Sequence, residues 1–123
     1  MKPLLLACFL AAAAGPALAV MAPQYYEQAR NEAPEVVIIE VASVKPPSGR
    51  DFGECLVRGR INRVERGRRR VGEHLELSVS CAGPRAQIPS GGTLWQDLER
   101  LKHSRYGRAF LGADGGVISY DML

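Results

Sequence analysis

The chain has 123 residues and a formal net charge of +3, from 16 Lys and Arg against 13 Asp and Glu, and it contains three cysteines. This length is enough for one small domain with a modest hydrophobic core, so a second domain is not expected. The mild net charge excludes a chain that is strongly basic throughout. The positive charge is instead concentrated between residues 58 and 70.

The N-terminus has the parts of a secretory signal peptide. Lys2 precedes the apolar run 4–14, which is followed by a Gly-Pro helix breaker and an A-x-A site that ends at Ala19. This arrangement predicts export, with cleavage after Ala19. A run of this length is too short to cross a bilayer, which takes about 20 residues. We therefore predict a signal peptide over residues 1–19 and a single domain over residues 20–123.

Three alternatives concern this leader. A second small-x-small site at residues 20–22 makes the cleavage boundary uncertain by a few residues. Lipidation at Cys8 is disfavoured because only four apolar residues precede this cysteine, too few to engage the export machinery. A structural core helix over the apolar run is the third alternative. No second apolar segment follows, so the mature chain is expected to have no transmembrane segment and to be periplasmic or secreted.

The first half of the mature chain predicts a helix, a strand and a loop. Residues 23–33 contain helix formers and predict a short helix that ends before Pro34. The segment EVVIIEVASVK, residues 35–45, is dense in β-branched residues and predicts a strand that is largely buried on both faces. The Pro and Gly content of residues 46–53 predicts a loop.

Two further strands, at about 54–64 and 72–81, are predicted to form an antiparallel hairpin. Once the leader is removed, Cys55 and Cys81 are the two remaining cysteines, and such a pair in an oxidising compartment predicts a disulfide. A hairpin centred on Arg68 places the two cysteines directly opposite one another. A redox-active pair is the alternative, but the Cys-x-x-Cys arrangement that lowers a thiol pKa is missing.

This register predicts the two faces of the hairpin. Odd-numbered positions form one apolar face that includes both cysteines, and even-numbered positions form a mainly polar face. On the polar face Arg60 is expected to meet Glu76, and Asn62 is expected to meet His74. The alternation shifts phase near the tip of the hairpin, where a bulge is expected.

The second half predicts a loop over residues 82–92, one helix and a second hairpin. Thr93 is expected to cap a helix over residues 94–104, in which Leu94, Trp95, Leu98 and Leu101 form one apolar stripe. Two strands separated by the turn Ala113-Asp114-Gly115-Gly116 follow. The fold class is therefore mostly β: a five-stranded OB-like Greek-key barrel with one helix between strands 3 and 4 and a short N-terminal helix.

A secreted, disulfide-bonded barrel of this kind resembles the netrin-type module of metalloproteinase inhibitors. That family presents an N-terminal cysteine to the protease zinc, and the predicted mature N-terminus here has no cysteine, so the resemblance does not imply inhibition. The segments CLVRGRI, RVERG, LELSVSCAGP and GGTLWQD also resemble small uncharacterised exported proteins of Gram-negative bacteria. This second resemblance implies a compartment and no activity.

The arginines of the hairpin are the candidate site for an anionic group or a protein partner. Arginine side chains suit phosphates and carboxylates, and a cluster of them attracts polyanions. A solvated hairpin tip whose charges prevent edge pairing is the alternative. Nucleic acid is disfavoured because residues 54–81 contain no aromatic side chain except that of His74. The candidate residues are Arg58, Arg60, Arg66, Arg68, Arg69 and Arg70, with Arg63 in the same run.

Trp95 is expected to anchor the helix in the core, and a role as a partner anchor is the alternative. His74 and His103 have no carboxylate or thiol at a metal-ligand spacing, so no metal or cofactor is expected. No serine is accompanied by a positioned base, so an enzyme is not expected. We predict an exported binding or accessory module that contacts a protein partner or anionic envelope groups. The alternative is a structural envelope protein without a discrete ligand.

Overall fold

The computed structural model describes residues 23–49, 51–88, 91 and 93–123. The predicted signal peptide, its cleavage site and Cys8 lie outside the described residues. No helix in the described part of the chain is long and apolar enough to cross a membrane.

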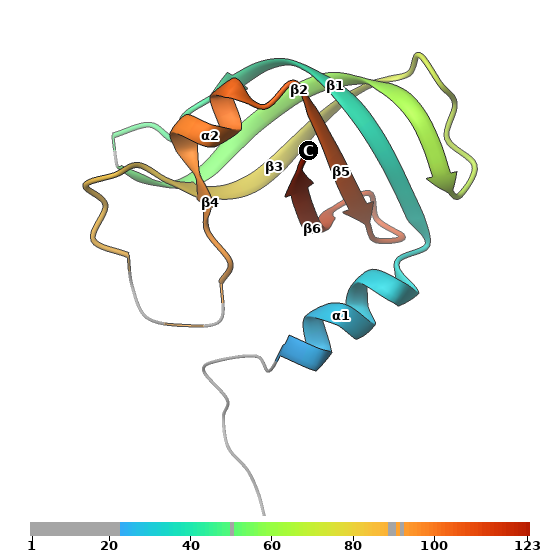
Figure 1. Ribbon diagram of the computed structural model, residues 1–123, viewed down its shortest axis with the longest axis horizontal. Helices are drawn as coiled ribbons and strands as arrows, with labels where there is room; N and C mark the ends of the chain where they lie inside the picture. The colour runs from blue at the N-terminus through green and yellow to red at the C-terminus, as the bar shows by residue number, and fades with distance from the viewer. Residues whose placement is uncertain (1–22, 50, 89–90, 92) are drawn as a thin grey trace, which may run out of the picture.

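The described chain is mostly β and forms one curled sheet with two short helices (Figure 1). In chain order its elements are α1 (Pro23–Glu32), β1 (Glu35–Lys45), β2 (Phe52–Arg66), β3 (His74–Ala82), β4 (Gln96–Asp97), α2 (Leu98–His103), β5 (Tyr106–Leu111) and β6 (Val117–Met122). The strand order is β4-β3-β2-β1-β5-β6, and all neighbours are antiparallel except β3 and β4. Figure 1 shows β5 and β6 beneath the arch of β1, β2 and β3. The predicted mostly-β, barrel-like class is confirmed.

The expected strand count of five is wrong, because β4 is a sixth strand inside the segment predicted to be helical. The Asp97 carboxylate accepts a hydrogen bond from the backbone amide of Arg100 at 3.0 Å, so Asp97 and not Thr93 is the N-cap of α2. The helix therefore has only six residues, and the extended residue pair before it adds a parallel edge to β3.

The hydrophobic core lies on one face of the curled sheet. Along β2, Cys55, Val57 and Ile61 are buried while Arg58 and Arg60 are exposed, which is the period-two pattern of a strand with one wet face. The core cluster consists of Val37, Ile39, Cys55, Val57, Ile61, Leu77, Val79, Cys81, Leu101, Ala109, Leu111 and Tyr120. The predicted apolar face of the hairpin is thus the core face.

Cys55 and Cys81 lie at disulfide distance, with their Cα atoms 5.8 Å apart. The expected register is nevertheless wrong by two residues, because Cys81 lies opposite Gly53 and Cys55 lies opposite Val79. The bond therefore joins diagonal neighbours on the same face. A shift of two residues leaves every side chain on its predicted face, which explains why the core residues could be predicted while their partners were not.

The register differs because the hairpin has no symmetric turn. β2 continues along β1 to Arg66, whereas β3 begins only at His74. The backbone of Ile61 donates to Glu73 and accepts from Gly72, each at 2.8 Å, and the residues between fold away as a tip. We call residues 67–73 the hairpin tip. Its position against β1 determines which arginines find partners.

Helix α1 is fixed to the outside of the sheet by arginines. Arg30 pairs with Asp121 of β6 at 2.5 Å, and its guanidinium lies 4.8 Å from the centre of the Phe110 ring. Arg66 donates to the backbone carbonyls of Arg30 and Ala33, at 3.2 and 2.6 Å. These contacts satisfy carbonyls that the end of a helix leaves without intrahelical partners.

Tyr120 lies across the backbone of β5 with its hydroxyl inside the core. Its residue is 3% exposed, and the hydroxyl has no hydrogen-bond partner among the described residues. A Cβ atom at Gly107 would collide with the Tyr120 ring and hydroxyl, so only glycine leaves room for them. Burial raises the pKa of Tyr120 to about 12.

Replacing both core cysteines, Cys55→Ala with Cys81→Ala, should lower the free energy of unfolding by about 3 kcal/mol, because the bond closes a loop between residues 26 apart. Urea unfolding measures the loss, and the wild type in reductant is the control that should show a comparable loss. Quantitative reaction of these two thiols before reduction would contradict the bond.

Tyr120→Phe should leave stability unchanged or raise it by about 1 kcal/mol at neutral pH, because it removes an unpaired buried hydroxyl. The folded-state pKa lies above the ordinary value, so folding favours the protonated phenol below pH 10, and this contribution is lost as the pH rises through 12. At about pH 11 the wild type should therefore lose roughly 1 kcal/mol more than the variant. Urea unfolding at both pH values measures this. Tyr25→Phe, at an exposed tyrosine, is the control. If Tyr120→Phe loses as much stability at about pH 11 as the wild type does, ionisation of Tyr120 is not the cause of the loss.

Candidate functional site

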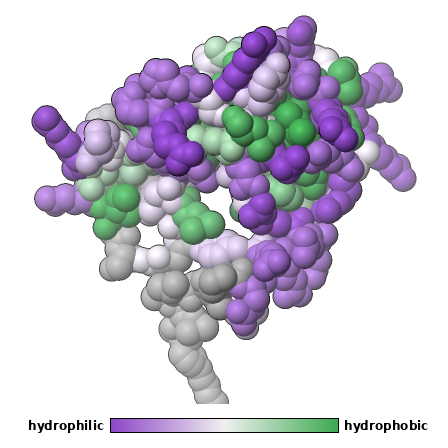
Figure 2. Space-filling model, in the orientation of Figure 1, coloured by the Kyte–Doolittle hydropathy of each residue, from purple (hydrophilic) through white to green (hydrophobic). Residues whose placement is uncertain are grey.

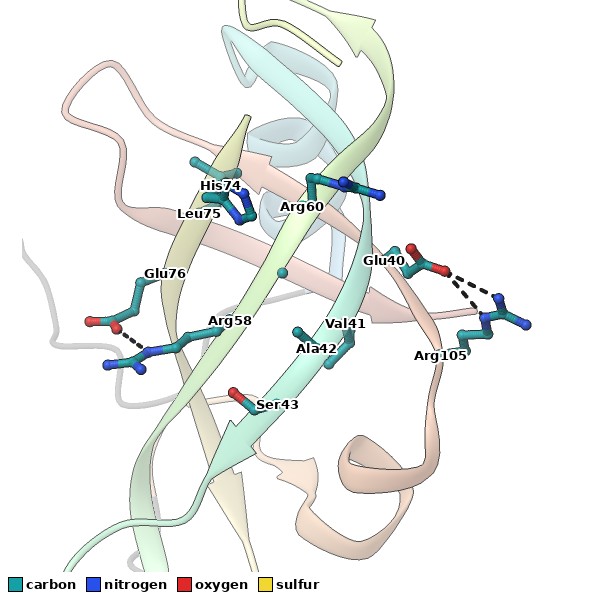
Figure 3. A pocket seen from close by; sticks show the side chains of 11 residues that line it. Glu40, Val41, Ala42, Ser43, Arg58, Arg60, His74, Leu75, Glu76 and Arg105 are labelled. Atoms are coloured by element: carbon teal, nitrogen blue, oxygen red, sulfur yellow. Dashed lines mark hydrogen bonds and ion pairs between the residues drawn. The ribbon is translucent and has the colours of Figure 1, made fainter. Parts of the chain in front are cut away.

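A groove of about 780 Å³ lies across β1, β2 and β3 (Figure 3). Its lining combines charged and polar residues with apolar residues of the three strands. The lining residues are Glu40, Val41, Ala42, Ser43, Arg58, Gly59, Arg60, His74, Leu75, Glu76 and Arg105. Figure 2 shows long hydrophilic side chains projecting around the visible face of the molecule, with hydrophobic patches between them.

Strand pairing places the polar residues of the groove in two rows. In the first row Arg60 of β2 lies between His74 of β3 and Glu40 of β1. In the second row Arg58 lies between Glu76 of β3 and Ser43 of β1. His74 was expected opposite Asn62, and Glu76 opposite Arg60. Both expectations are wrong, for the same reason that the cysteine pairing is diagonal.

Gly59 separates the two arginines of the groove and lets β1 approach β2 closely. A Cβ atom at this position would collide with the backbone carbonyl oxygen of Glu40. Val41 and Leu75, the neighbours of Gly59 on the two flanking strands, pack against the core and also contribute to the lining of the groove. The groove therefore combines cations with an apolar lining.

Two ion pairs lie at opposite margins of the groove (Figure 3). Arg58 donates to Glu76 at 2.5 Å on one side, and Arg105 contacts Glu40 at 3.2 Å on the other. Arg60 lies between them and makes no ion pair or side-chain hydrogen bond with any described residue. The lining carries three arginines and two carboxylates, so Arg60 is the cation whose charge is not compensated.

One arginine of the hairpin tip is neutralised by a carboxylate of the tip and a carboxylate of β1. Arg69 contacts Glu35 of β1 at 3.2 Å and Glu73 at 2.9 Å, and its side chain is only 24% exposed. Partial burial alone would lower the pKa of Arg69, but its hydrogen bonds and charge interactions with the two carboxylates outweigh burial and raise this pKa. Arg69 is thus a structural cation.

Glu65 does not oppose the tip arginines, although it is the only carboxylate within the run. It forms a two-bond contact with Arg108 of β5, at 2.6 and 3.2 Å. The hydrogen bond from Arg108 lowers the pKa of Glu65, and the same contact raises the pKa of Arg108. This pair fastens β2 to β5 across β1.

The six candidate arginines therefore divide into two sets. Arg58, Arg66 and Arg69 are held by carboxylates or helix carbonyls, whereas Arg60, Arg68 and Arg70 are exposed and have no side-chain partner in the described chain. Sequence reasoning missed the partners Glu35, Glu40 and Arg105 because they come from other strands and loops. The i,i+4 spacing of Arg69 and Glu73 was the one local signal.

Trp95 and the two histidines lie at separate places. Trp95 is half-buried and packs edge to face on Phe52, with ring centres 5.4 Å apart, while Leu101 of α2 is the buried core residue. The core-anchor interpretation of Trp95 is thus wrong, and its role as a partner anchor stays a prediction. His103 contacts the backbone carbonyl of Glu99 in the last turn of α2. Among the described residues no three His, Cys, Asp or Glu side chains gather where they could hold a metal ion.

Arg69→Gln should lower the free energy of unfolding by about 1 kcal/mol, because it leaves two partly buried carboxylates without their cation. Arg60→Gln is the matched control, since it makes the same change at an unpaired arginine, and its effect should stay within about 0.5 kcal/mol. Urea unfolding at low and high salt compares them. Equal effects would contradict the division into held and unpaired arginines.

No family model matches the sequence, and neither the curated proteins nor the solved structures contain a significant match to it.

Proposed function

We propose that this chain is an exported binding or accessory module whose groove on β1, β2 and β3 holds an anionic group through Arg60. The observation that carries the proposal is the unpaired guanidinium of Arg60 between two arginine–carboxylate pairs. Those two ion pairs neutralise the arginines at the margins of the groove. The guanidinium of Arg60 is left as the planar donor for a ligand. A guanidinium suits a carboxylate or a phosphate because it donates two parallel hydrogen bonds.

The lining of the groove limits the chemical class of ligand that fits it. Val41, Ala42, Gly59 and Leu75 contribute apolar surface beside Arg60. An anionic group attached to an apolar part therefore fits better than a small free anion, because burial of apolar area adds to the ionic contact. Two sources share this chemistry: an acidic side chain with apolar neighbours on a protein partner, and a phosphate carried by an envelope lipid.

The strand order supports an OB-like barrel. After α2 the chain returns so that β5 lies against β1, on the side away from β2, and this is the long connection that makes a Greek key. In OB-folds the face of strands 2 and 3 is the usual ligand surface, and the groove lies on that face. This likeness is one of fold, so it supports the location of a site and not its ligand.

A structural envelope protein without a discrete ligand is the second candidate. It is favoured by the three arginines that are already held by the chain's own carboxylates and helix carbonyls. Under this proposal the arginine-rich segment serves to fasten α1 and the hairpin tip to the sheet.

Arg60→Ser should weaken retention on an immobilised lipopolysaccharide or on an immobilised acidic peptide with apolar neighbours, by about tenfold in affinity. Retention at increasing salt measures the effect, and the two matrices distinguish the two sources of the anion. Arg100→Ser is the matched control, because Arg100 is an exposed arginine of α2 outside the groove. Equal losses in both variants would indicate unspecific charge attraction, and unchanged retention of Arg60→Ser would favour the structural role.

A further inference from the structure

The hairpin tip contains consecutive arginines on an exposed loop, which is the chemistry that endopeptidases with an acidic specificity pocket recognise. Four peptide bonds in the tip or at its start follow an arginine, those after Arg66, Arg68, Arg69 and Arg70. Cleavage requires an arginine side chain that can enter the pocket of the protease and a carbonyl that can enter its oxyanion hole. The structure distinguishes the four bonds on both requirements.

Two of these bonds follow arginines whose side chains are occupied. Arg66 donates to the carbonyls at the end of α1, and its backbone pairs with Val36 of β1. Arg69 is held by Glu35 and Glu73 and is only 24% exposed. Neither side chain enters a protease pocket without breaking these contacts.

The peptide bond after Arg70 is protected from cleavage by backbone hydrogen bonds. The amide of Glu73 donates to the carbonyl of Arg70 at 3.1 Å, and the Glu73 carboxylate accepts from the amide of Arg70 at 3.3 Å. This turn occupies the carbonyl that would have to enter the oxyanion hole. The Arg70 side chain is exposed, so the obstacle at this bond is the turn.

The bond between Arg68 and Arg69 meets both requirements. The Arg68 side chain is exposed and has no partner, and neither the Arg68 carbonyl nor the Arg69 amide is hydrogen-bonded within the described chain. We infer that the Arg68–Arg69 peptide bond is a processing site for a trypsin-like endopeptidase. This inference is independent of the proposed function, because it does not involve the groove.

Cleavage at this bond yields a two-chain protein that stays together. Water adds across the amide, so Arg68 ends in a carboxylate and Arg69 begins with an ammonium group. The Cys55–Cys81 bond joins the two products, because the cut lies within the loop that it closes.

The oxidised protein is digested with a limiting amount of trypsin, and mass spectra are recorded before and after reduction. The first cut within residues 66–71 is expected after Arg68. Before reduction the product should have the mass of the intact chain plus one water; after reduction it should separate into fragments that end at Arg68 and begin at Arg69. Arg68→Gln should slow this cut by more than about a hundredfold, because the pocket of the protease then loses its cation.

Arg70→Gln is the matched control, since it removes the same charge two residues away and should leave the rate of the Arg68 cut unchanged. A first tip cut after Arg66, Arg69 or Arg70 overturns the inference. So does the absence of any tip cut while cuts accumulate elsewhere in the chain. Equal slowing by the two glutamine variants also overturns it, because that result indicates general charge attraction instead of recognition of Arg68.

Discussion

Strand β2 pairs with β3 from Phe52 to Arg60 and with β1 from Leu56 to Arg66, and this offset determines how the rest of the molecule is arranged. Where β3 is missing, the second half of β2 carries the hairpin tip to the start of β1, where Arg69 contacts Glu35. The same half reaches the end of α1 through Arg66. The groove lies where all three strands still run together, so β2 contributes to the groove, to the hairpin tip and to the contact with α1.

Charge is distributed according to this arrangement. The carboxylates that neutralise arginines of β2 and its tip come from β1 and β3 and from the tip itself, as Glu35, Glu76 and Glu73 do. They hold the arginines that fasten one element to another. The remaining arginines do not connect two elements, and their charges are not neutralised within the described chain. A count of arginines in the sequence therefore overstates the positive charge that a partner can contact.

The sequence allowed the fold class, the core face of the hairpin and the two paired cysteines to be predicted, because all three depend on local alternation and on residue type. The cross-strand partners could not be predicted, because they depend on where the hairpin turns, and an irregular tip of seven residues has no simple sequence signature. The α2 boundary was wrong because Thr93 and Asp97 are both good caps, and only packing chooses between them. The division of the arginines required partners from distant strands, such as Glu35 and Glu40, which no local pattern could indicate.

The contact between Arg30 of α1 and Asp121 of β6 joins residues 91 positions apart. A ribosome makes the chain from its N-terminus, so α1 is complete long before the strand that receives it exists. During that interval Arg30 lacks its carboxylate partner, and an isolated helix of ten residues is barely stable in water. The contact of the first described element with Asp121 therefore forms only after the last strand has been synthesised.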